Sequence, residues 1–371
     1  MYNPTCSDLQ SCGRENNVDI SNIISHFSIE GQLSEIHVNR EGHINNTFVC
    51  TFTSNGVSTK YTLQHINRKV FSHPEEVMEN IQYVTDHIKN KTKHLANCDQ
   101  RCLSLVPAKT GERFFIDEEG EYWRVYRYIE HVRTFNTICE RSQAYLFGQA
   151  VGSFQNQLSD FDGRKLHITI PDFHNMAFRY AQLSEACTID CKGRLKLVGP
   201  ELEFLEENRQ RGLAIWDGMK KGLFPTRVTH NDTKMNNVLF SEDGKEALCI
   251  IDLDTVMPGT ILFDTGDMIR TAVNTAAEDE KDLSKVACDK GLYHALIEGY
   301  RQEAVAFLTE DETSNIKESG RNITQIMAVR FLTDYLNGDV YYQIEKPEHN
   351  LDRARTQIAL MKSMDRSWHE L

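Results

Sequence analysis

Short stretches of alternating apolar and polar residues dominate the first part of the chain and predict an antiparallel sheet. Residues 34–66 contain two strand-like segments, TFVCTFT (47–53) and KYTLQHI (60–66), which the turn SNGVS (54–58) separates. The bend that precedes the first of them contains Gly42. We therefore expect residues 34–66 to form a β-meander with tight turns.

A long helix and a second hairpin are expected after this meander. The segment 73–92 has Pro74 in the first turn of the expected helix. Its apolar side chains recur at helical spacing, at Val77, Ile81, Val84 and Ile88. The segment 113–130 then predicts two strands that turn at Glu119-Gly120. The first 130 residues should thus be mostly antiparallel sheet with one long helix.

Beyond residue 130 the apolar positions follow a helical period. Residues 142–161 and 200–222 both predict amphipathic helices, and helices are again expected from about residue 282 to the end. This change predicts an α+β fold of two lobes. We expect a β-rich lobe over 1–130, whose residues 1–20 form a ragged polar terminus, and a larger helical lobe over 131–371.

The composition restricts the partners of the protein. Its 371 residues include 54 acidic and 41 basic side chains, which give a formal net charge of −13. Such a surface repels nucleic-acid phosphates and anionic lipids, so neither nucleic acid nor a membrane is an expected partner. The N-terminus shows no basic stretch followed by an apolar run, and no apolar run of about 18 residues occurs. We therefore expect a cytoplasmic protein whose ten cysteines are reduced thiols.

Polar side chains gather in the segment VTHNDTKMNNVLF (228–240). Phosphoryl transfer from ATP needs a carboxylate that accepts the proton of the attacking hydroxyl, and oxygen ligands for magnesium. Kinases place this aspartate five residues before a metal-binding asparagine, and a second metal-binding aspartate follows a short hairpin. Asp232 precedes Asn237 by five residues, and Asp252 comes 15 residues later, after two strand-like segments joined by the turn SEDGK.

The residue types in this pattern suit separate roles. Asp232 is expected to be the catalytic base, and its position should matter more than its basicity, because an ordinary aspartate is already charged at neutral pH. Asn237 and Asp252 offer the oxygen atoms that Mg²⁺ prefers. His230 is expected to lie buried under the loop and to hold backbone carbonyls. Lys234 is expected to neutralise charge on the transferred phosphoryl group.

Two other interpretations of these residues exist. The sequence HND (230–232) alone is compatible with a metal-dependent hydrolase, but the further histidine ligands of such enzymes do not accompany it. Asp252 and Asp254 follow an apolar strand and are also suited to cap the next element. The ordered set of two aspartates and one asparagine favours the kinase interpretation.

These motifs resemble those of the aminoglycoside phosphotransferase/choline kinase superfamily. HNDTKMNN (230–237) is similar to its H-[GN]-D-x-x-x-x-N loop, IIDLD (250–254) to its metal-binding segment, and FDTGDMI (263–269) to the acidic segment that often follows. The resemblance covers nearly the whole chain. It implies a two-lobed protein-kinase-like fold, with a small sheet lobe that binds nucleotide and a larger helical lobe that holds the catalytic and substrate-binding residues. It also implies ATP as co-substrate and Mg²⁺ as cofactor.

Three further stretches resemble the N-acetylhexosamine 1-kinases: GHINNTF (42–48), YTLQHINRKVFSHPEEVMENI (61–81) and VRFLTDYLNGDVYY (329–342). Those enzymes phosphorylate the anomeric hydroxyl of N-acetylglucosamine and N-acetylgalactosamine. The resemblance implies that four residues contact the sugar: His43, Asn45, Arg330 and Tyr341. The alternative for Arg330 is an i,i+4 pair with Asp334 on an exposed helix face.

The first lobe departs from the protein-kinase pattern at its phosphate site. Where protein kinases have a glycine-rich loop, this chain has one glycine, Gly42, which is expected to cover the phosphates. Gln64 occupies the position expected for the phosphate-binding lysine. Three nearby cations are alternatives: Lys60, Arg68 and Lys69. Two glutamates on the following helix are expected partners of the cation that is used: Glu76 and Glu79. Adenine is expected to lie against the backbone of Tyr128, Ile129 and Glu130.

We therefore expect an enzyme that uses MgATP to phosphorylate an N-acetylhexosamine at its anomeric oxygen. The first alternative is the same machinery with another hydroxyl substrate, such as choline, homoserine or a different sugar. Choline would need an aromatic cage, and the three tryptophans are scattered along the sequence. The second alternative is a non-catalytic relative that binds nucleotide or sugar, against which the intact set of Asp232, Asn237 and Asp252 argues.

Overall fold

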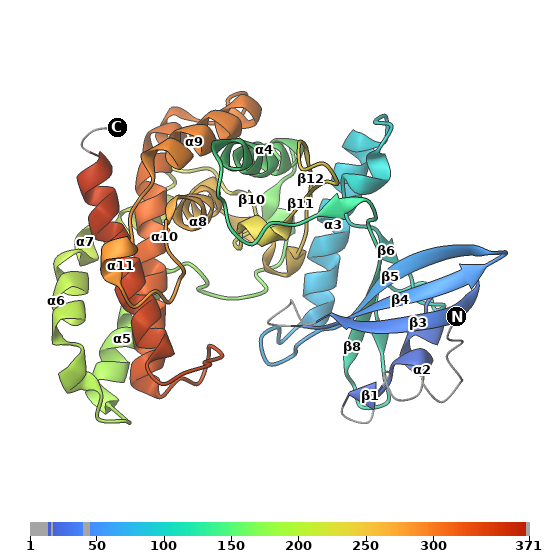
Figure 1. Cartoon of the computed structure of the whole chain (residues 1–371), viewed down its shortest axis with the longest axis horizontal. Helices are drawn as coiled ribbons and strands as arrows, with labels where there is room; N and C mark the ends of the chain where they lie inside the picture. Colours follow the sequence, from blue (N-terminus) through green and yellow to red (C-terminus); the bar gives the residue numbers. More distant parts are fainter. Residues whose placement is uncertain (1–13, 16–17, 40–44, 369–371) are drawn as a thin grey trace. The chain divides into compact units, whose positions relative to one another are not determined.

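A computed structural model of the protein describes residues 14–15, 18–39 and 45–368. The chain forms two compact units, whose elements are labelled in Figure 1. The described residues up to Val132 belong to the first unit, together with Leu166–Ile170 and Ile251–Val256. Arg133–Lys165, Pro171–Ile250 and the residues from Met257 onward form the second unit. The segment around Asp252, expected in the second lobe, therefore belongs to the first unit.

An antiparallel sheet forms the centre of the first unit (Figure 1). Its strand order is β3-β4-β5-β8-β6, and β7 also pairs with β8. The strands are β3 (Gln32–Asn39), β4 (Asn46–Ser54), β5 (Val57–His65), β6 (Leu105–Val106), β7 (Phe115–Ile116) and β8 (Tyr122–Arg127). A short pair precedes them, β1 (Arg14–Glu15) with β2 (Val18–Asp19). Asn55 and Gly56 connect β4 to β5 with φ values of 53° and 79°, the left-handed conformation that a two-residue hairpin turn requires.

One face of this sheet carries the apolar core of the first unit. Phe48, Leu63, Trp123 and Val125 pack there with the helix α2 (Ile20–Ser25). Side chains alternate along a strand, so the residues between them project from the opposite face. Among these are Gln64 on β5 and Arg124 on β8, which matter for the site described below.

The long helix of the first unit is α3 (Pro74–Thr92). It begins at Pro74, as expected, and Glu75 and Glu76 in its first turn complement the positive end of the helix dipole. Its buried residues include all four apolar positions at helical spacing: Val77, Ile81, Val84 and Ile88. The hairpin predicted over 113–130 is also confirmed, with its turn at Gly120 (φ 80°).

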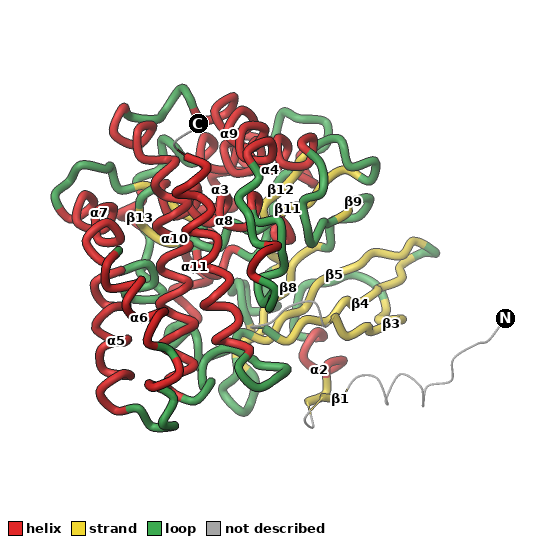
Figure 2. The backbone as a smooth tube through the Cα atoms, turned by 60° about the vertical axis from the view of Figure 1, so that its left-hand side comes forward, coloured by secondary structure: helices red, strands yellow, loops and turns green. Residues whose placement is uncertain are grey.

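Helices dominate the second unit, as Figure 2 shows. They are α4 (Arg141–Gln157), α5 (Met176–Ile189), α6 (Gly199–Glu207), α7 (Arg209–Lys220), α8 (Ile261–Val273), α9 (Lys290–Ala304), α10 (Glu310–Asn337) and α11 (His349–Trp368). α10 packs against α5, α8 and α11. α4 and α9 lie close together because glycines face the partner backbone, and a Cβ on Gly148 would lie 2.0 Å from the carbonyl oxygen of Leu296.

One helix prediction in this unit is wrong. Residues 200–222 form two helices instead of one, because the chain leaves helical geometry at Asn208. The side-chain amide of Asn208 donates to the carbonyl of Phe204, and its own carbonyl accepts a hydrogen bond from Gln325 of α10. The local side-chain bond competes with the helix, and the bond to Gln325 is a tertiary contact that the local sequence pattern does not contain.

Short strands and turns complete the second unit. β10 (Arg227–Thr229) pairs with β13 (Met257–Gly259), and β11 (Val238–Ser241) pairs with β12 (Ala247–Ile250). The second pair confirms the hairpin predicted around the turn SEDGK. The 3-10 turns of this unit are η2 (Gly163–Lys165), η3 (Leu195–Leu197), η4 (Met235–Asn237) and η6 (Leu283–Lys285). The turns η1 (Cys98–Gln100) and η5 (Leu253–Thr255) belong to the first unit, and β9 (Val132–Arg133) lies where the first unit ends and the second begins.

Two general properties concern the described part of the chain as a whole. Within it, no helix is long and apolar enough to cross a membrane. The eight cysteines that the structure describes are free thiols.

Candidate active site

The loop after β10 is fixed by one buried carboxylate, that of Asp264 at the start of α8. The backbone N–H groups of His230 and Asn231 donate to its two oxygens, over 3.0 Å and 2.7 Å. The Thr233 hydroxyl donates to the Asp264 carbonyl over 2.6 Å. These bonds hold Asn231 in a left-handed conformation (φ 67°), which places Asp232 next in the chain at a defined position.

Asp264 is itself supported from inside the unit. The amide of Gln155 donates to its carboxylate over 3.2 Å, and the hydroxyl of Tyr300 donates to the Gln155 oxygen over 2.6 Å. Burial raises the pKa of Asp264, although the nearby His230 and the backbone N–H groups act in the opposite direction. The sequence marked FDTGDMI only as an acidic segment. Its first aspartate is a loop-holding residue that this reasoning missed.

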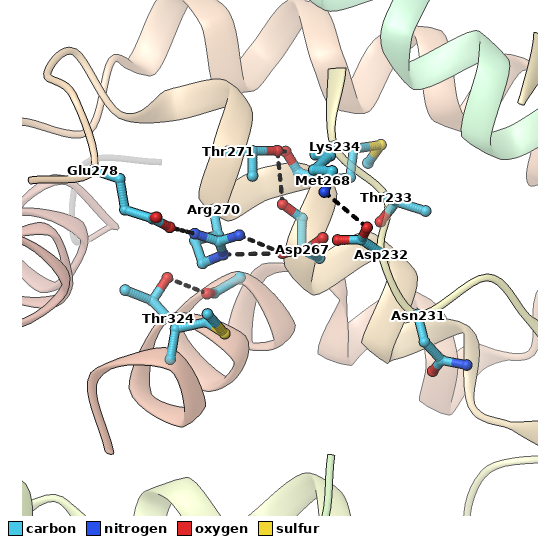
Figure 3. A network of polar contacts seen from close by, with 12 residues as sticks. Asn231, Asp232, Thr233, Lys234, Asp267, Met268, Arg270, Thr271, Glu278 and Thr324 are labelled. Atoms are coloured by element: carbon cyan, nitrogen blue, oxygen red, sulfur yellow. Dashed lines mark hydrogen bonds and ion pairs between the residues drawn. The ribbon is translucent and has the colours of Figure 1, made fainter. Parts of the chain in front are cut away.

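Asp232, the expected base, lies between a cation and an amide. Its Oδ2 atom is 2.9 Å from the Nζ of Lys234, and the Asn237 amide donates to the same oxygen over 3.1 Å. The Asn237 amide also donates to the Asp232 carbonyl over 2.9 Å. Figure 3 shows Lys234 directed at the Asp232 carboxylate. The structure thus places three of the expected site residues in mutual contact on one loop.

The charge of Asp232 is set by these neighbours. Partial desolvation favours the neutral acid, but the ammonium group of Lys234 outweighs it, together with His230 and the Asn237 hydrogen bond, and lowers the pKa of Asp232. The carboxylate is therefore ionised at neutral pH. The role of Asp232 as proton acceptor stays a prediction, and with this pKa such a role would depend on position rather than on strong basicity.

His230 also makes a contact that the expectation did not include. Its ring is buried, as expected, and packs edge-on against Phe154 at a centroid distance of 5.8 Å. Its Nδ1 atom accepts a hydrogen bond from the backbone N–H of Asp232 over 3.3 Å. In this contact the ring holds a backbone N–H group of the loop, and the expected bonds to backbone carbonyls stay a prediction.

A second carboxylate of the same unit lies within electrostatic reach of Asp232. Asp267 on α8 is buried and pairs with Arg270, whose guanidinium also contacts Glu278 over 3.1 Å (Figure 3). Burial raises the pKa of Asp267 to about 6 against the effect of Arg270, and the charge of Asp232 adds to the rise. Asp232 and Asp267 are therefore both fully charged only above that pH.

In the first unit, Asp252 and Asp254 follow β12 on the turn η5. Asp252 has a left-handed backbone (φ 64°, ψ 56°), and within the described chain its side chain makes no capping hydrogen bond to η5. Asp254 is 3% exposed and forms a two-point ion pair with Arg124, whose exposure is 1%. The alternative that Asp252 caps the next element is therefore not supported by a side-chain capping bond. Asp254 acts as the ion-pair partner of Arg124.

The position expected for a phosphate-binding lysine has an unexpected neighbour. Gln64 lies directly opposite Arg124 in the pairing of β5 with β8, and its side-chain oxygen accepts from the Arg124 Nε and NH2 over 3.0 Å and 2.8 Å. Reasoning from the sequence missed Arg124. Its position in an alternating strand was visible in the sequence. That it lies opposite Gln64 depends on the register between β5 and β8, which the sequence pattern does not give.

Two of the three other cations considered for this role, Lys60 and Arg68, have different contacts. Lys60 lies 3.8 Å from Glu130 and over the ring of Tyr128, and Arg68 donates to the carbonyl of Gly120 over 3.1 Å. The helix glutamates also differ from the expectation: Glu79 contacts His167 at 2.6 Å, and Glu76 lies 3.9 Å from the same ring. The contacts described for both glutamates are thus with His167, and their pairing with a lysine or arginine stays a prediction.

Some backbone groups of the segment expected to face adenine already form hydrogen bonds within the protein. The Tyr128 N–H donates to the carbonyl of Lys60 over 3.1 Å, and the carbonyl of Glu130 accepts from the Gln100 amide over 3.0 Å. Ile129, between them, is 9% exposed. Adenine recognition at these three residues stays a prediction.

The residues expected at the sugar fall in three places. Gly42 and His43 lie outside the described residues. Asn45 donates to Asp254 over 2.5 Å, and its side-chain oxygen accepts from the backbone N–H of Asn67 over 3.0 Å, both within the first unit. Arg330 and Tyr341 lie in the second unit, on α10 and in the loop after it. Sugar contact by these residues stays a prediction.

Arg330 lies among aromatic rings. Its guanidinium carbon is 5.1 Å from the ring centre of Phe173, 5.7 Å from that of Tyr341 and 5.5 Å from that of Tyr342. Asp334 is buried and accepts the backbone N–H groups of Val340, Tyr341 and Tyr342. These contacts contradict the alternative of an exposed pair between Arg330 and Asp334.

Each of the two residues expected to bind magnesium carries a suitable oxygen atom. The nitrogen of Asn237 faces Asp232, so its amide oxygen is the atom that would take a cation, and Asp252 offers a carboxylate. Among the described residues there is no cluster of three or more histidine, cysteine, aspartate or glutamate side chains able to hold a metal. Mg²⁺ needs only one or two protein oxygens when nucleotide phosphates complete its shell.

Comparison with known proteins agrees with these features. The model of the phosphotransferase enzyme family matches residues 36–302, well over half of the chain, which therefore belongs to this family. A crystal structure of an aminoglycoside phosphotransferase from Alicyclobacillus acidocaldarius is 12% identical with a TM-score of 0.63, over 96% of this chain and 98% of the other. An ethanolamine kinase from Plasmodium vivax is 14% identical with a TM-score of 0.54, over 92% and 85%.

A third solved structure is that of a spectinomycin phosphotransferase in complex with ADP and spectinomycin. It is 11% identical, with a TM-score of 0.58 over 94% of this chain and 97% of the other. At these identities the likenesses concern the fold alone. They confirm the expected α+β class, with an antiparallel sheet and a helical part of protein-kinase-like type.

Proposed function

We propose that the protein is an ATP-dependent kinase that phosphorylates the anomeric hydroxyl of an N-acetylhexosamine. The observation that carries the kinase assignment is the position of Asp232, which is held between Lys234 and Asn237 on a loop anchored by Asp264. Loops of this composition position a hydroxyl group and accept its proton in phosphoryl transfer.

ATP is the proposed phosphoryl donor. Structurally similar phosphotransferases include one solved with ADP bound, which supports a nucleotide site in this fold. Asn237 and Asp252 would hold Mg²⁺, which neutralises negative charge on the phosphates as the terminal phosphoryl group leaves ADP. The net charge of −13 makes such local neutralisation necessary for a bound triphosphate.

The chain's own residues then act on the acceptor. The acceptor oxygen forms a bond to the terminal phosphorus, the bond between that phosphorus and the ADP oxygen breaks, and the hydroxyl proton passes to Asp232. The low pKa of Asp232, caused by Lys234 against desolvation, suits an acceptor whose hydroxyl is more acidic than that of an ordinary alcohol. An anomeric hydroxyl has this property. Lys234 also supplies positive charge beside the transferred group.

The aromatic cluster in the second unit supports a sugar over a quaternary amine. The rings of Phe173, Tyr341 and Tyr342 offer surfaces on which a pyranose can stack, and Arg330 offers hydrogen-bond donors. Cages for choline also use aromatic rings. Here the cation of Arg330 already lies over these rings, and its charge would repel a quaternary ammonium group. The resemblance of residues 42–48 and 329–342 to N-acetylhexosamine 1-kinases points to the same acceptor.

Purified protein incubated with MgATP and separate acceptors tests the proposal. The acceptors are N-acetylglucosamine, N-acetylgalactosamine, glucose, choline, ethanolamine and homoserine, with ADP release and ³¹P NMR as readouts. We expect a sugar 1-phosphate from an N-acetylhexosamine, and a loss of at least about 100-fold in turnover, at nearly unchanged ATP affinity, in Asp232→Asn. Transfer only to another acceptor would replace the substrate assignment. Nucleotide binding without turnover of any acceptor would support a non-catalytic relative.

A further inference from the structure

We infer that Arg124 is a positioning residue, which holds the metal-binding segment Asp252–Asp254 through its buried ion pair with Asp254. This inference rests on the proposed kinase function. The pair would do in this chain what the pairing of a strand lysine with a helix glutamate does in protein kinases, where it keeps the nucleotide site in its active geometry.

The register of the sheet shows which strand carries the positive charge near the position expected for the lysine. Thr47, Gln64 and Arg124 stand opposite one another on β4, β5 and β8. Gln64 donates to the Thr47 hydroxyl over 3.1 Å and accepts from Arg124 with its other amide atom. The place of the expected lysine is thus filled by a neutral side chain, and the positive charge lies one strand further across the same face.

Arg124 is built to hold a carboxylate rather than to contact phosphate. Its Nε bonds to Gln64, its NH1 to Asp254 and its NH2 to both. The side chain is 1% exposed. All three nitrogens are therefore occupied within the first unit, and a phosphate oxygen would have to displace one of these partners.

Asp254 is correspondingly engaged through both oxygens. Oδ1 and Oδ2 accept from Arg124, and Oδ2 also accepts from Asn45 over 2.5 Å. A carboxylate bound in this way is a poor candidate for a metal ligand. It fixes the backbone two residues after Asp252, whose left-handed conformation (φ 64°) depends on its surroundings because a non-glycine residue seldom adopts it.

The positive charge of Arg124 is stabilised by the negative charges of the segment that it holds. Burial alone would lower the pKa of Arg124, but the charges of Asp254 and, to a smaller extent, Asp252 raise it. Arg124 is therefore charged at every accessible pH. Its charge offsets part of the repulsion between the two aspartates and between Asp252 and a nucleotide.

A magnesium titration of nucleotide binding tests the inference without any acceptor. Binding of a fluorescent ATP analogue is measured at increasing Mg²⁺ in the wild type, Arg124→Lys, Asp254→Asn and the double variant. We expect each single variant to raise the half-saturating Mg²⁺ concentration by about tenfold or more, as outer partners of metal ligands do. The double variant should shift it no further than the larger single change, because both remove one interaction.

The second unit offers a matched control for loss of a buried arginine pair. Arg321 is also 1% exposed and binds Asp365 through Nε and NH2, over 2.8 Å and 3.1 Å. Arg321→Lys should lower the melting temperature and leave the Mg²⁺ midpoint within about twofold of the wild type. Equal Mg²⁺ midpoints in Arg124→Lys and Arg321→Lys would overturn the positioning role, as would additive shifts in the double variant.

A milder variant covers the case in which Arg124→Lys does not fold. Gln64→Leu keeps both charges and removes one partner that orients the guanidinium. We expect a shift in the Mg²⁺ midpoint of about threefold at unchanged melting temperature, and no shift would contradict the inference. Wild-type protein that shows no Mg²⁺-dependent nucleotide binding would instead refute the proposed function. If the wild type binds nucleotide with normal Mg²⁺ dependence but does not phosphorylate a sugar, only the substrate assignment fails. The Mg²⁺ midpoints of the variants still decide the role of Arg124.

Discussion

The Nζ atom of Lys234 lies 2.9 Å from Oδ2 of Asp232, the carboxylate that we propose accepts the proton. The sequence suggested only that Lys234 neutralises charge on the transferred phosphoryl group, and this contact adds a second role. Lys234 keeps Asp232 ionised against desolvation, and it also brings positive charge to the site of transfer. The two roles can be separated by their dependence on pH.

Lys234→Met is expected to move the acidic limb of the pH–rate profile upward. Lys234 lowers the pKa of Asp232, so removing its charge raises that pKa, and activity that depends on the ionised carboxylate is lost at a higher pH. The measurement is kcat/KM from pH 4 to 8. Lys245→Met is the matched control, because Lys245 lies 3.4 Å from Asp243 in an exposed pair. If the acidic limb stays unchanged while kcat falls, Lys234 does not set the pKa of Asp232. Its role would then be limited to neutralising charge on the transferred phosphoryl group.

The sequence predicted the local elements well where local residues determine them. The β4–β5 turn needs two residues with positive φ, and Asn55 and Gly56 are of the residue types that adopt such a conformation most readily. The grouping of Asp232, Lys234 and Asn237 on one loop was also predictable, because the three residues lie within six positions of one another. Strand alternation and helical spacing account for the rest of the predicted elements.

Features that depend on distant partners were not predictable in this way. The sequence analysis did not single out Arg124, because its contacts depend on the pairing of β8 with β5 and on Asp254, which follows 130 residues later. The break at Asn208 depends on Gln325 of α10. Asp264 could be found as an acidic residue, but its bonds to the backbone of the loop are tertiary contacts.

Asp252→Ala is expected to abolish Mg²⁺-dependent binding of ATP. The carboxylate of Asp252 is the charged oxygen ligand that we assign to the metal, and alanine removes it without adding bulk. Isothermal titration of ATP with and without Mg²⁺ measures the effect. Asp243→Ala, at an exposed turn of the hairpin between β11 and β12, is the control. ATP binding that keeps its metal dependence would show that the metal site lies elsewhere.

Arg330→Met is expected to raise KM for the sugar by about tenfold or more while KM for ATP changes by less than about twofold. Methionine keeps contact with the rings of Phe173, Tyr341 and Tyr342 but removes the hydrogen-bond donors. Steady-state kinetics with each substrate varied in turn gives both constants. Arg353→Met is the control, since Arg353 of α11 lies over the aromatic ring of Phe331 on α10. Similar effects of the two substitutions would assign Arg330 a packing role only.

The stability of the second unit should fall in mild acid because His174 is buried as a neutral ring. Burial lowers its pKa from 6.5 to about 3, and the charge of Arg330 acts in the same direction. Between these values the unfolded chain binds a proton that the folded chain does not, so stability is present above pH 6.5 and is lost as the pH falls.

His174→Gln should remove this dependence. Glutamine can still donate to the carbonyl of Asn231, which the His174 ring approaches at 3.3 Å, and it does not titrate. From pH 7 to pH 5 the free energy of unfolding of the wild type should fall by about 2 kcal/mol more than that of the variant, since each pH unit below 6.5 contributes about 1.4 kcal/mol. Urea unfolding at pH 7, 6 and 5 measures the difference, with exposed His37→Gln as the control. Parallel loss of stability in wild type and His174→Gln would show that other groups cause the acid sensitivity.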